Sequence, residues 1–209
     1  GAGWTLETLR SMLSVGHLVT AWRTLWLSAA ATAVCLALAV PTGYAMARAS
    51  RRTRRMLLLL VVVPFWTSSL VRVFAWKVLL HPDGWVKTGL AWCGLVGEDA
   101  LLLYNAAPVL LVLVYTYLPF AILPVYAAAE RFDRSLLEAA RDLGATRVQA
   151  FVRVFVPGIR RGLLAATLLV LIPALGSYVI PDLVGGRNSE MIGNKIAQRA
   201  FVDRNLTLA

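Results

Sequence analysis

The sequence is poor in cysteine and histidine, and this shortage excludes two classes of protein. Its 209 residues include two cysteines and two histidines. Cys35 falls inside a long apolar run and Cys93 in a loop-like segment, so we expect no disulfide between them. His17 and His81 are isolated, without metal-ligand spacing around them. The sequence therefore excludes a disulfide-rich secreted fold, and we expect neither a metal nor a cofactor.

Charged residues are also scarce, and this excludes an ordinary soluble domain. Only 15% of the residues are charged and 59% are hydrophobic, whereas soluble domains are about 25% charged. A membrane-spanning helix takes roughly 20 residues, and four apolar segments are long enough, at 25–47, 56–80, 101–128 and 163–183. Lipid offers no hydrogen bonds to an open backbone, so such segments cross as helices. The sequence predicts an all-α, polytopic membrane helix bundle.

Acidic residues are few as well, 11 against 21 lysines and arginines, which gives a net charge of +10. Most of the arginines lie in two links between predicted spans. They are Arg48, Arg51, Arg52, Arg54 and Arg55 in the first link, and Arg131, Arg134, Arg141, Arg147, Arg153, Arg160 and Arg161 in the second. The positive-inside rule places residues 48–55 and 130–162 in the cytoplasm, and residues 81–100 outside. Because topology explains the charge, we expect a lipid bilayer and no nucleic acid as the partner.

The second predicted span, 56–80, changes character halfway along its length. Its first half is aliphatic, and its second half carries polar and aromatic residues and Arg72. A cation near a helix centre costs about 2.5–3.5 kcal/mol on insertion scales, so we expect Arg72 to face a cavity, a partner or the outer headgroups. Pro64 removes a backbone hydrogen bond before the polar half, which predicts a bent helix. Pro119, Pro124 and Pro173 indicate further bends or hinges.

The second basic link contains a charged, helix-prone stretch, SLLEAARDLGATRVQAFVRVFVPGIRRG, at residues 135–162. Ser135 and Glu138 match the S-x-x-E capping box, and Asp133 is an alternative cap for the same helix. Gly144 is suited to end that helix, because glycine accepts the left-handed backbone conformation. The pattern predicts a short helix followed by a glycine turn.

A second helix is expected directly after this turn. Thr146 and Gln149 form another capping box, T-x-x-Q, and Pro157 is expected to end the helix. Residues 130–162 therefore predict two short cytoplasmic helices. Without further information they could also form a connector that lies on the headgroups.

The order of residues in this stretch resembles the EAA loop of permease subunits in binding-protein-dependent ABC importers. Glu138, Ala139, Ala140, Gly144 and Pro157 occupy the positions of the family pattern, and apolar residues replace its Ile and Leu just before the proline. The resemblance implies a type I importer permease fold. It also implies that the first short helix is a coupling helix that seats in a groove of an ATPase subunit.

Three further segments are similar to the spermidine/putrescine branch of these permeases. They are VPFWTSSLVRVFAW, YTYLPFAILPVYAA and PALGSYVIPDLVGGRNSEMIGN. Such permeases have six spans, so we expect the chain, 1–209, to be the core of one transmembrane permease domain that contains the coupling loop at 130–162. The branch carries an acidic residue in a GEF sequence where this chain has GSY, with Ser177 at that position. A dication would favour carboxylates along its path.

The resemblance implies a non-enzymatic transport subunit of a bacterial inner membrane. Its expected partners are cytoplasmic ATP-binding subunits, a second permease subunit of the same or another kind, and an extracytoplasmic solute-binding protein. We expect Glu138, Ala139, Ala140, Asp142, Gly144 and Pro157 to couple it to the ATPase. The solute path is expected at Trp66, Ser68, Ser69, Tyr178 and Asp182, with Arg72 as a structural or gating ion partner.

Other functions stay open on the sequence alone. The solute could be a polyamine, or another small organic solute such as an amino-acid-like compound, an opine or an organic anion. A passive channel or a membrane scaffold needs no ATPase contact. A membrane-embedded hydrolase needs a nucleophile and base, or a metal cluster, at one depth. No histidine lies within a predicted span and the acidic residues are scattered, which argues against the hydrolase.

Overall fold

The computed structural model describes residues 15–81, 103–186 and 191–198, and every regular element in these ranges is helical. The elements are α2 (Val15–Arg48), α3 (Arg51–Val62), η1 (Val63–Trp66), α4 (Ser69–Leu79), α6 (Ala106–Glu130), α7 (Ser135–Asp142), α8 (Arg147–Ala150), η2 (Phe151–Phe155), α9 (Val156–Gly158), α10 (Arg160–Leu175), α11 (Val179–Val184) and α12 (Ile192–Ala197). The predicted outer loop at 81–100 lies outside the described residues, apart from its first position. The all-α expectation is confirmed for the described part.

Two of the four predicted spans are continuous helices. The apolar part of α2 contains the first, and α6 contains most of the third and begins at Ala106 rather than at residue 101. Both are long and apolar enough to cross a membrane. The α6 helix continues through Pro119 and Pro124, so neither proline breaks it.

The other two predicted spans are interrupted, which corrects the expectation of continuous helices at 56–80 and 163–183. In the first, Pro64 lies in the 3₁₀ turn η1, which ends at Trp66, and α4 begins at Ser69. The interruption expected near Pro64 is confirmed, at Thr67 and Ser68 directly after the turn that contains the proline. In the second, α10 ends at Leu175 and α11 begins at Val179. A further bend of 70° separates Gly158 from Arg160. The described chain has up to four spans if each bent pair crosses the membrane once.

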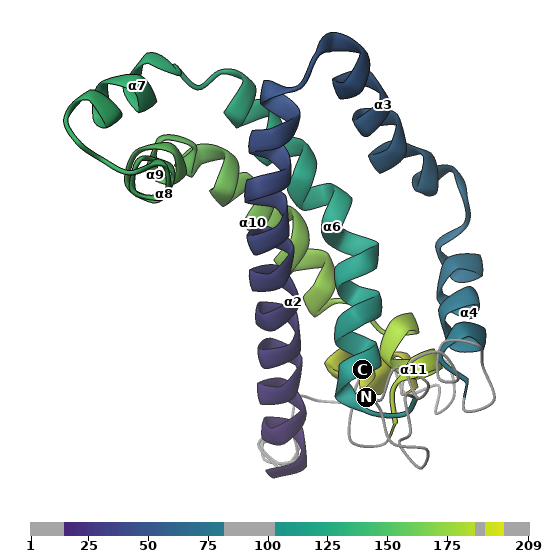
Figure 1. Ribbon diagram of the computed structural model, residues 1–209. Helices are drawn as coiled ribbons and strands as arrows, with labels where there is room; N and C mark the ends of the chain where they lie inside the picture. Colours follow the sequence, from purple (N-terminus) through teal and green to yellow (C-terminus); the bar gives the residue numbers. More distant parts are fainter. Residues whose placement is uncertain (1–14, 82–102, 187–190, 199–209) are drawn as a thin grey trace, which may run out of the picture. The chain divides into compact units, whose positions relative to one another are not determined.

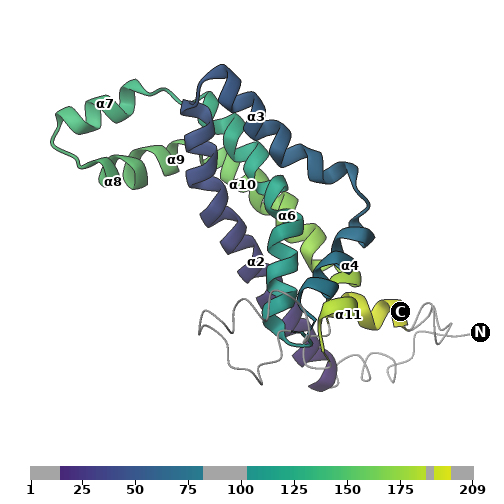
Figure 2. The ribbon, with the colours of Figure 1, turned by 45° about the vertical axis from the view of Figure 1, so that its right-hand side comes forward.

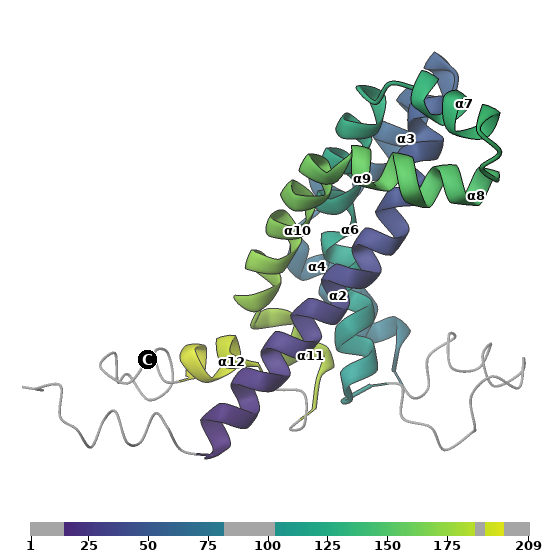
Figure 3. The same ribbon diagram turned by 90° about the vertical axis from the view of Figure 1, so that its left-hand side faces the viewer.

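The chain divides into two compact units, and one of them contains Thr32–Trp66 and Thr116–Leu171. In this unit the C-terminal half of α2 and the start of α10 lie along α6 (Figure 1, Figure 3). Backbones approach closely at two glycines: a Cβ on Gly43 would lie 2.9 Å from Val125, and one on Gly162 would lie 2.4 Å from the Ala128 Cβ. Small residues at such contacts allow the van der Waals packing that holds membrane helices together.

This close approach predicts that Gly162→Ala destabilises the unit. The added methyl would also lie 2.9 Å from the Pro124 carbonyl oxygen, so the helices must separate at a cost of about 1–3 kcal/mol. We expect a lower thermal unfolding midpoint in detergent. Gly176→Ala is the matched control, because the nearest atom to its added methyl is 3.8 Å away. Equal midpoints for the two variants would contradict this packing.

The other unit contains Gly1–Ala31, Thr67–Tyr115 and Ile172–Ala209. Within it α11 packs against α4 (Figure 1, Figure 2). The short α12 helix is joined to α2 by a hydrogen bond in which the Ile192 N–H donates to Thr24 Oγ1 at 2.9 Å. Asn194 also donates to the Tyr178 carbonyl oxygen at 3.0 Å. These bonds fix the chain on both sides of α11, which contains Asp182 and is preceded by Tyr178, two of the residues expected at the solute path.

Candidate functional site

The polar hairpin, residues 135–158, consists of α7 as its first limb and the continuous helix α8–η2–α9 as its second (Figure 2). The first limb is capped by Asp133, whose carboxylate accepts a hydrogen bond from the Ser135 N–H at 3.0 Å. This bond lowers the pKa of Asp133 below its usual range. Ser135 is the first helical residue and makes no capping bond, so the expected Ser135–Glu138 capping box is wrong and the alternative cap is confirmed.

Gly144 forms the turn between the limbs, as predicted. It has a φ of +89°, and its N–H donates to the Arg141 carbonyl oxygen at 2.9 Å. The Ala145 N–H donates to the Ala140 carbonyl oxygen at 3.0 Å. These two bonds are the Schellman pattern that satisfies the last carbonyl groups of a helix. The turn therefore requires a residue that accepts the left-handed conformation.

This geometry predicts the effect of substitutions at Gly144. A Cβ at this position meets no atom within 4 Å, so any cost arises from the backbone conformation alone. Gly144→Val is expected to weaken the hairpin by about 1–2 kcal/mol, seen as faster amide hydrogen exchange in α7. Asn tolerates this conformation better than other residues, so Gly144→Asn is the control. Equal exchange in both variants would contradict the requirement.

The second limb begins with the predicted capping box. The Gln149 N–H donates to Thr146 Oγ1 at 3.2 Å, and the Thr146 N–H donates to Gln149 Oε1 at 2.9 Å. Pro157 does not end this limb, which corrects the expectation: the helix continues to Gly158. The five residues of η2 form a π-helix, in which the Val156 N–H donates to the Phe151 carbonyl oxygen. This wider turn lies just before the proline, and the chain bends only at Ile159.

An aromatic cluster joins the second limb to α2 and to the end of α6. The Phe155 side chain is 1% exposed, and its ring centroid lies 4.7 Å from that of Tyr44 and 5.2 Å from that of Phe132. Phe151 lies 5.1 Å from Tyr44. A Cβ on Gly158 would lie 2.3 Å from the Phe132 ring, so this glycine also allows the close packing. The cluster was not expected from the sequence.

The two faces of α7 differ in character. Leu136, Ala139 and Leu143 are exposed, and Leu143 is 89% exposed. At 100° per residue these three positions lie on one face, which we name the outward strip. Leu137, Glu138 and Arg141 lie on the opposite face and line a pocket. Of the expected coupling residues, Ala139 belongs to the outward strip and Ala140 lies beside it, half-buried.

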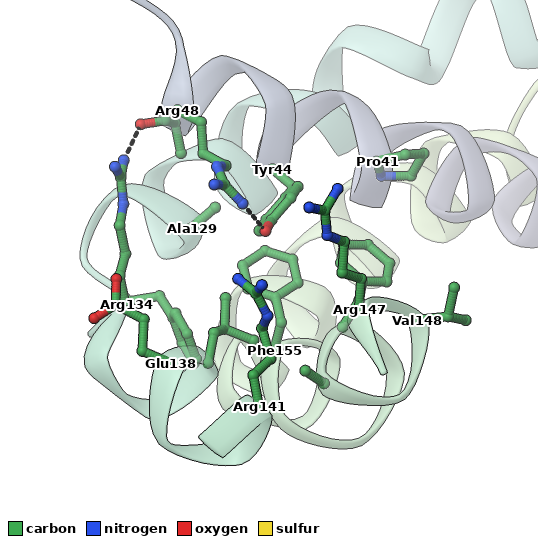
Figure 4. Close-up of a pocket in the computed structure, with 15 residues that line it drawn as sticks. Pro41, Tyr44, Arg48, Ala129, Arg134, Glu138, Arg141, Arg147, Val148 and Phe155 are labelled. Atoms are coloured by element: carbon green, nitrogen blue, oxygen red, sulfur yellow. Dashed lines mark hydrogen bonds between the residues drawn. The ribbon is translucent and has the colours of Figure 1, made fainter. Parts of the chain in front are cut away.

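The pocket lies between α7, the second limb and the C-terminal ends of α2 and α6 (Figure 4). Its volume is about 630 Å³. Four arginines and one glutamate line it together with aromatic and aliphatic residues. The charged residues are Arg48, Arg134, Arg141, Arg147 and Glu138. Within the described residues no group of three or more His, Cys, Asp or Glu side chains could hold a metal ion.

The residues expected at the solute path are not all brought together. Ser68, Ser69 and Arg72 flank or belong to α4, and Tyr178 and Asp182 flank or belong to α11, which packs against it. Ser68, Ser69, Tyr178 and Asp182 are exposed and Arg72 is half-buried. Trp66 is 82% exposed and belongs to the other compact unit. The described structure therefore places five of the six on two packed elements.

Comparison with known proteins gives a family match over most of the chain. Residues 39–202 match the family described as "Binding-protein-dependent transport system inner membrane component". The spermidine/putrescine transport system permease protein PotB of Escherichia coli strain K12 is 36% identical over 193 residues, covering 92% of this chain and 70% of PotB. PotB of Haemophilus influenzae is 39% identical over 201 residues, covering 96% of this chain and 70% of the relative.

A more distant relative and a solved structure agree with this match. The inner membrane ABC transporter permease protein YdcU of E. coli K12 is 32% identical over 219 residues, covering 98% of this chain and 69% of YdcU. A crystal structure of a bacterial ABC transporter involved in the import of the acidic polysaccharide alginate has a TM-score of 0.73 at 17% identity. That match covers 99% of this chain and 76% of the other. At this identity the structural likeness establishes the fold.

Proposed function

Since this chain belongs to the binding-protein-dependent transport system inner membrane component family, we propose that it forms part of the path by which a polyamine crosses the membrane. Membership makes it a multi-pass permease subunit of a bacterial inner membrane, without catalytic chemistry of its own. ATP hydrolysis takes place on separate ATP-binding subunits, and a periplasmic binding protein completes the system. The observation that carries the polyamine proposal is the 36–39% identity to PotB permeases over more than nine-tenths of the chain.

The proposed contact with the ATP-binding subunit is the outward strip of α7. Leu143 and Leu136 are both more than half exposed, although burying a leucine is worth about 1.5–3 kcal/mol. Ala139 and Ala140 are small enough for close approach of another surface. Gly144 fixes the orientation of the strip and Asp133 caps its helix. The π-helix and Pro157 connect the strip to the bend before α10, so displacement of the hairpin would be transmitted to a spanning helix.

The proposed solute path includes the faces of α4 and α11. Asp182 is the only carboxylate among the described residues of its unit, and it is exposed. A polyamine is a polycation, so a single carboxylate on α11, which packs against the helix that Ser68 and Ser69 begin, is a chemically suitable contact. Ser177, where the PotB-like branch is acidic, is buried. In this chain Asp182 is therefore proposed to take the larger share of cation recognition.

This assignment predicts the effect of Asp182→Asn. We expect the KM for spermidine uptake to rise roughly fivefold, with little change in the maximal rate. An exposed ion pair contributes about 1 kcal/mol to binding, and its loss weakens binding by that factor. The measurement is radiolabelled uptake into vesicles that contain the assembled transporter. Asp182→Glu is the control, because it keeps a carboxylate at the same position. An unchanged KM for Asp182→Asn would remove this residue from the path.

The function itself is tested by reconstituting the full-length subunit with its ATP-binding subunits, its partner permease and its binding protein. We expect ATP-dependent uptake of spermidine or putrescine, and no uptake when the binding protein is left out. Preferred uptake of an amino-acid-like compound or an organic anion would replace the polyamine with that solute. Uptake without ATP would indicate a passive channel. Parallel assembly with one or two kinds of permease subunit would decide between a homodimer and a heterodimer.

A further inference from the structure

The pocket behind α7 carries an excess of positive charge. Arg48, Arg134, Arg141 and Arg147 line it, and among the described residues Glu138 is the only carboxylate that does. Arg48 donates to the Tyr44 hydroxyl, with its guanidinium 5.0 Å from the Tyr44 ring centroid. Figure 4 shows the guanidinium groups of Arg48, Arg141 and Arg147 around Tyr44. Four cations against one anion leave a site that attracts a negatively charged ligand.

Among the described residues, no carboxylate forms an ion pair with any of these four arginines. Arg134 donates to the Ala47 carbonyl oxygen, a neutral acceptor. No hydrogen bond or ion pair joins the Arg141 or Arg147 side chain to any residue that the structure describes. Asp142 lies in an adjoining polar pocket together with Glu138, Arg141 and Arg147, and it too forms no ion pair there. Two arginines, both exposed, therefore have donors that no described residue uses and that a ligand could take.

The location of the pocket indicates where the ligand comes from. Ala47 and Arg48 end the first span and Ala129 lies next to the end of α6, so the predicted topology places the pocket at the depth of the cytoplasmic headgroups. Pro41 and Phe151 add an apolar wall. Basic pockets at this depth between spanning helices suit lipid headgroups, and about 630 Å³ lies within the usual range for ligand sites.

We propose that this pocket binds a phosphate group, supplied in the membrane by the headgroup of an anionic phospholipid. Arginine presents several donors in a planar fork that matches phosphate oxygens. The inference rests on the family topology and not on the identity of the transported solute. The face of α7 opposite the outward strip lines the pocket, so the lipid and the ATP-binding subunit would contact different sides of one helix. A bound lipid would hold α7 against α2 and fix the hairpin in place.

The test is native mass spectrometry of the detergent-purified, full-length complex titrated with phosphatidylglycerol or phosphatidylcholine. We expect a retained phosphatidylglycerol adduct, weakened at least about tenfold by Arg141→Gln combined with Arg147→Gln. Arg153→Gln combined with Arg160→Gln is the matched control. It removes the same charge from the same link, from two exposed residues that do not line the pocket. The control is expected to retain the lipid within about twofold of the unmodified complex.

A parallel titration with inorganic phosphate distinguishes the two sources of the anion. Lipid retention that millimolar phosphate does not reduce supports a headgroup site. A site for a soluble phosphate is supported by a different result. In that case the unmodified complex binds inorganic phosphate but no lipid, and the variant with Arg141→Gln and Arg147→Gln loses the phosphate. Equal retention of lipid in the pocket and control variants would overturn the proposal. A lipid adduct that forms only after the ATP-binding subunits are removed from the complex would also overturn it, because the arginines would then belong to the subunit contact.

Discussion

Leu143→Glu is expected to abolish ATP-driven uptake while leaving the permease folded. The side chain is 89% exposed at the end of α7, so its replacement breaks no described contact within the subunit. In the assembled transporter the proposed socket would lose a buried leucine and receive an unpaired carboxylate. The two effects together are expected to weaken binding of the ATP-binding subunit by about 100-fold. Binding is measured by titrating the purified subunit, and uptake in vesicles.

Val152→Glu is the matched control for this prediction. Val152 is also an exposed apolar residue of the polar hairpin, but it lies on η2 in the second limb. We expect its replacement to leave subunit binding unchanged. If Leu143→Glu bound the ATP-binding subunit normally, the outward strip would not be the contact. If both variants lost binding, the contact would extend over both limbs.

Phe155→Ala is expected to have the largest effect on stability. Its ring is almost fully buried and contacts three others, those of Tyr44, Phe132 and Phe151. Truncating a buried phenylalanine costs about 3–5 kcal/mol. These rings join the second limb to α2 and α6. We therefore expect the hairpin of the variant to detach at a lower temperature than that at which the spans unfold. Thermal unfolding in detergent and hydrogen exchange across residues 146–158 measure the two effects.

Phe74→Ala is the control for the loss of a phenyl ring. Phe74 is half exposed on α4, so its truncation creates a smaller cavity and we expect a correspondingly smaller shift of the unfolding midpoint. Phe155→Leu keeps most of the buried volume, so its unfolding midpoint is expected to lie between those of Phe155→Ala and Phe74→Ala. A Phe155→Ala midpoint no lower than that of Phe74→Ala would show that the aromatic cluster does not anchor the hairpin.

The local features of the hairpin could be predicted because local rules determine them. A capping box needs only a hydroxyl and an amide three residues apart, which Thr146 and Gln149 provide. The turn at Gly144 needs only a residue that accepts a positive φ. Ser135 and Asp133 were both expected as possible caps of α7. In the structure the Asp133 carboxylate is the cap and accepts a hydrogen bond from the Ser135 N–H. Sequence alone left this choice open, since both residues are capable caps.

The breaks within two predicted spans could not be located by hydrophobicity. An apolar window averages over residues such as Thr67 and Ser68, where the helix is interrupted. Gly176 and Ser177 interrupt another apolar run in the same way, and the packing of α11 on α4 then fixes the direction of the chain. Pro157 was expected to stop a helix, and the helix ends one residue later, at Gly158. The π-helix before the proline was not expected, because no local sequence rule predicts it.

The pocket and the aromatic cluster depend on contacts between distant segments. Tyr44, Phe132 and Phe155 come from three different parts of the chain, and no spacing rule relates them. The arginines of the pocket were interpreted only as markers of topology. Their arrangement around Tyr44 arises because the end of α2, α7 and the second limb all line one pocket. Family resemblance supplied the role of the hairpin, and the structure supplies which face of α7 is free.

The central claim is that the outward strip of α7 contacts the ATP-binding subunit, and disulfide crosslinking tests it most directly. The assembled transporter would carry Leu143→Cys or Ala140→Cys, with Cys35 and Cys93 replaced by alanine and single cysteines placed along the groove of the ATP-binding subunit. Leu137→Cys, on the pocket face, is the control. We predict efficient crosslinks from residues 143 and 140 and none from residue 137. An actively transporting complex that crosslinks at 137 and not at 143 or 140 would contradict the account.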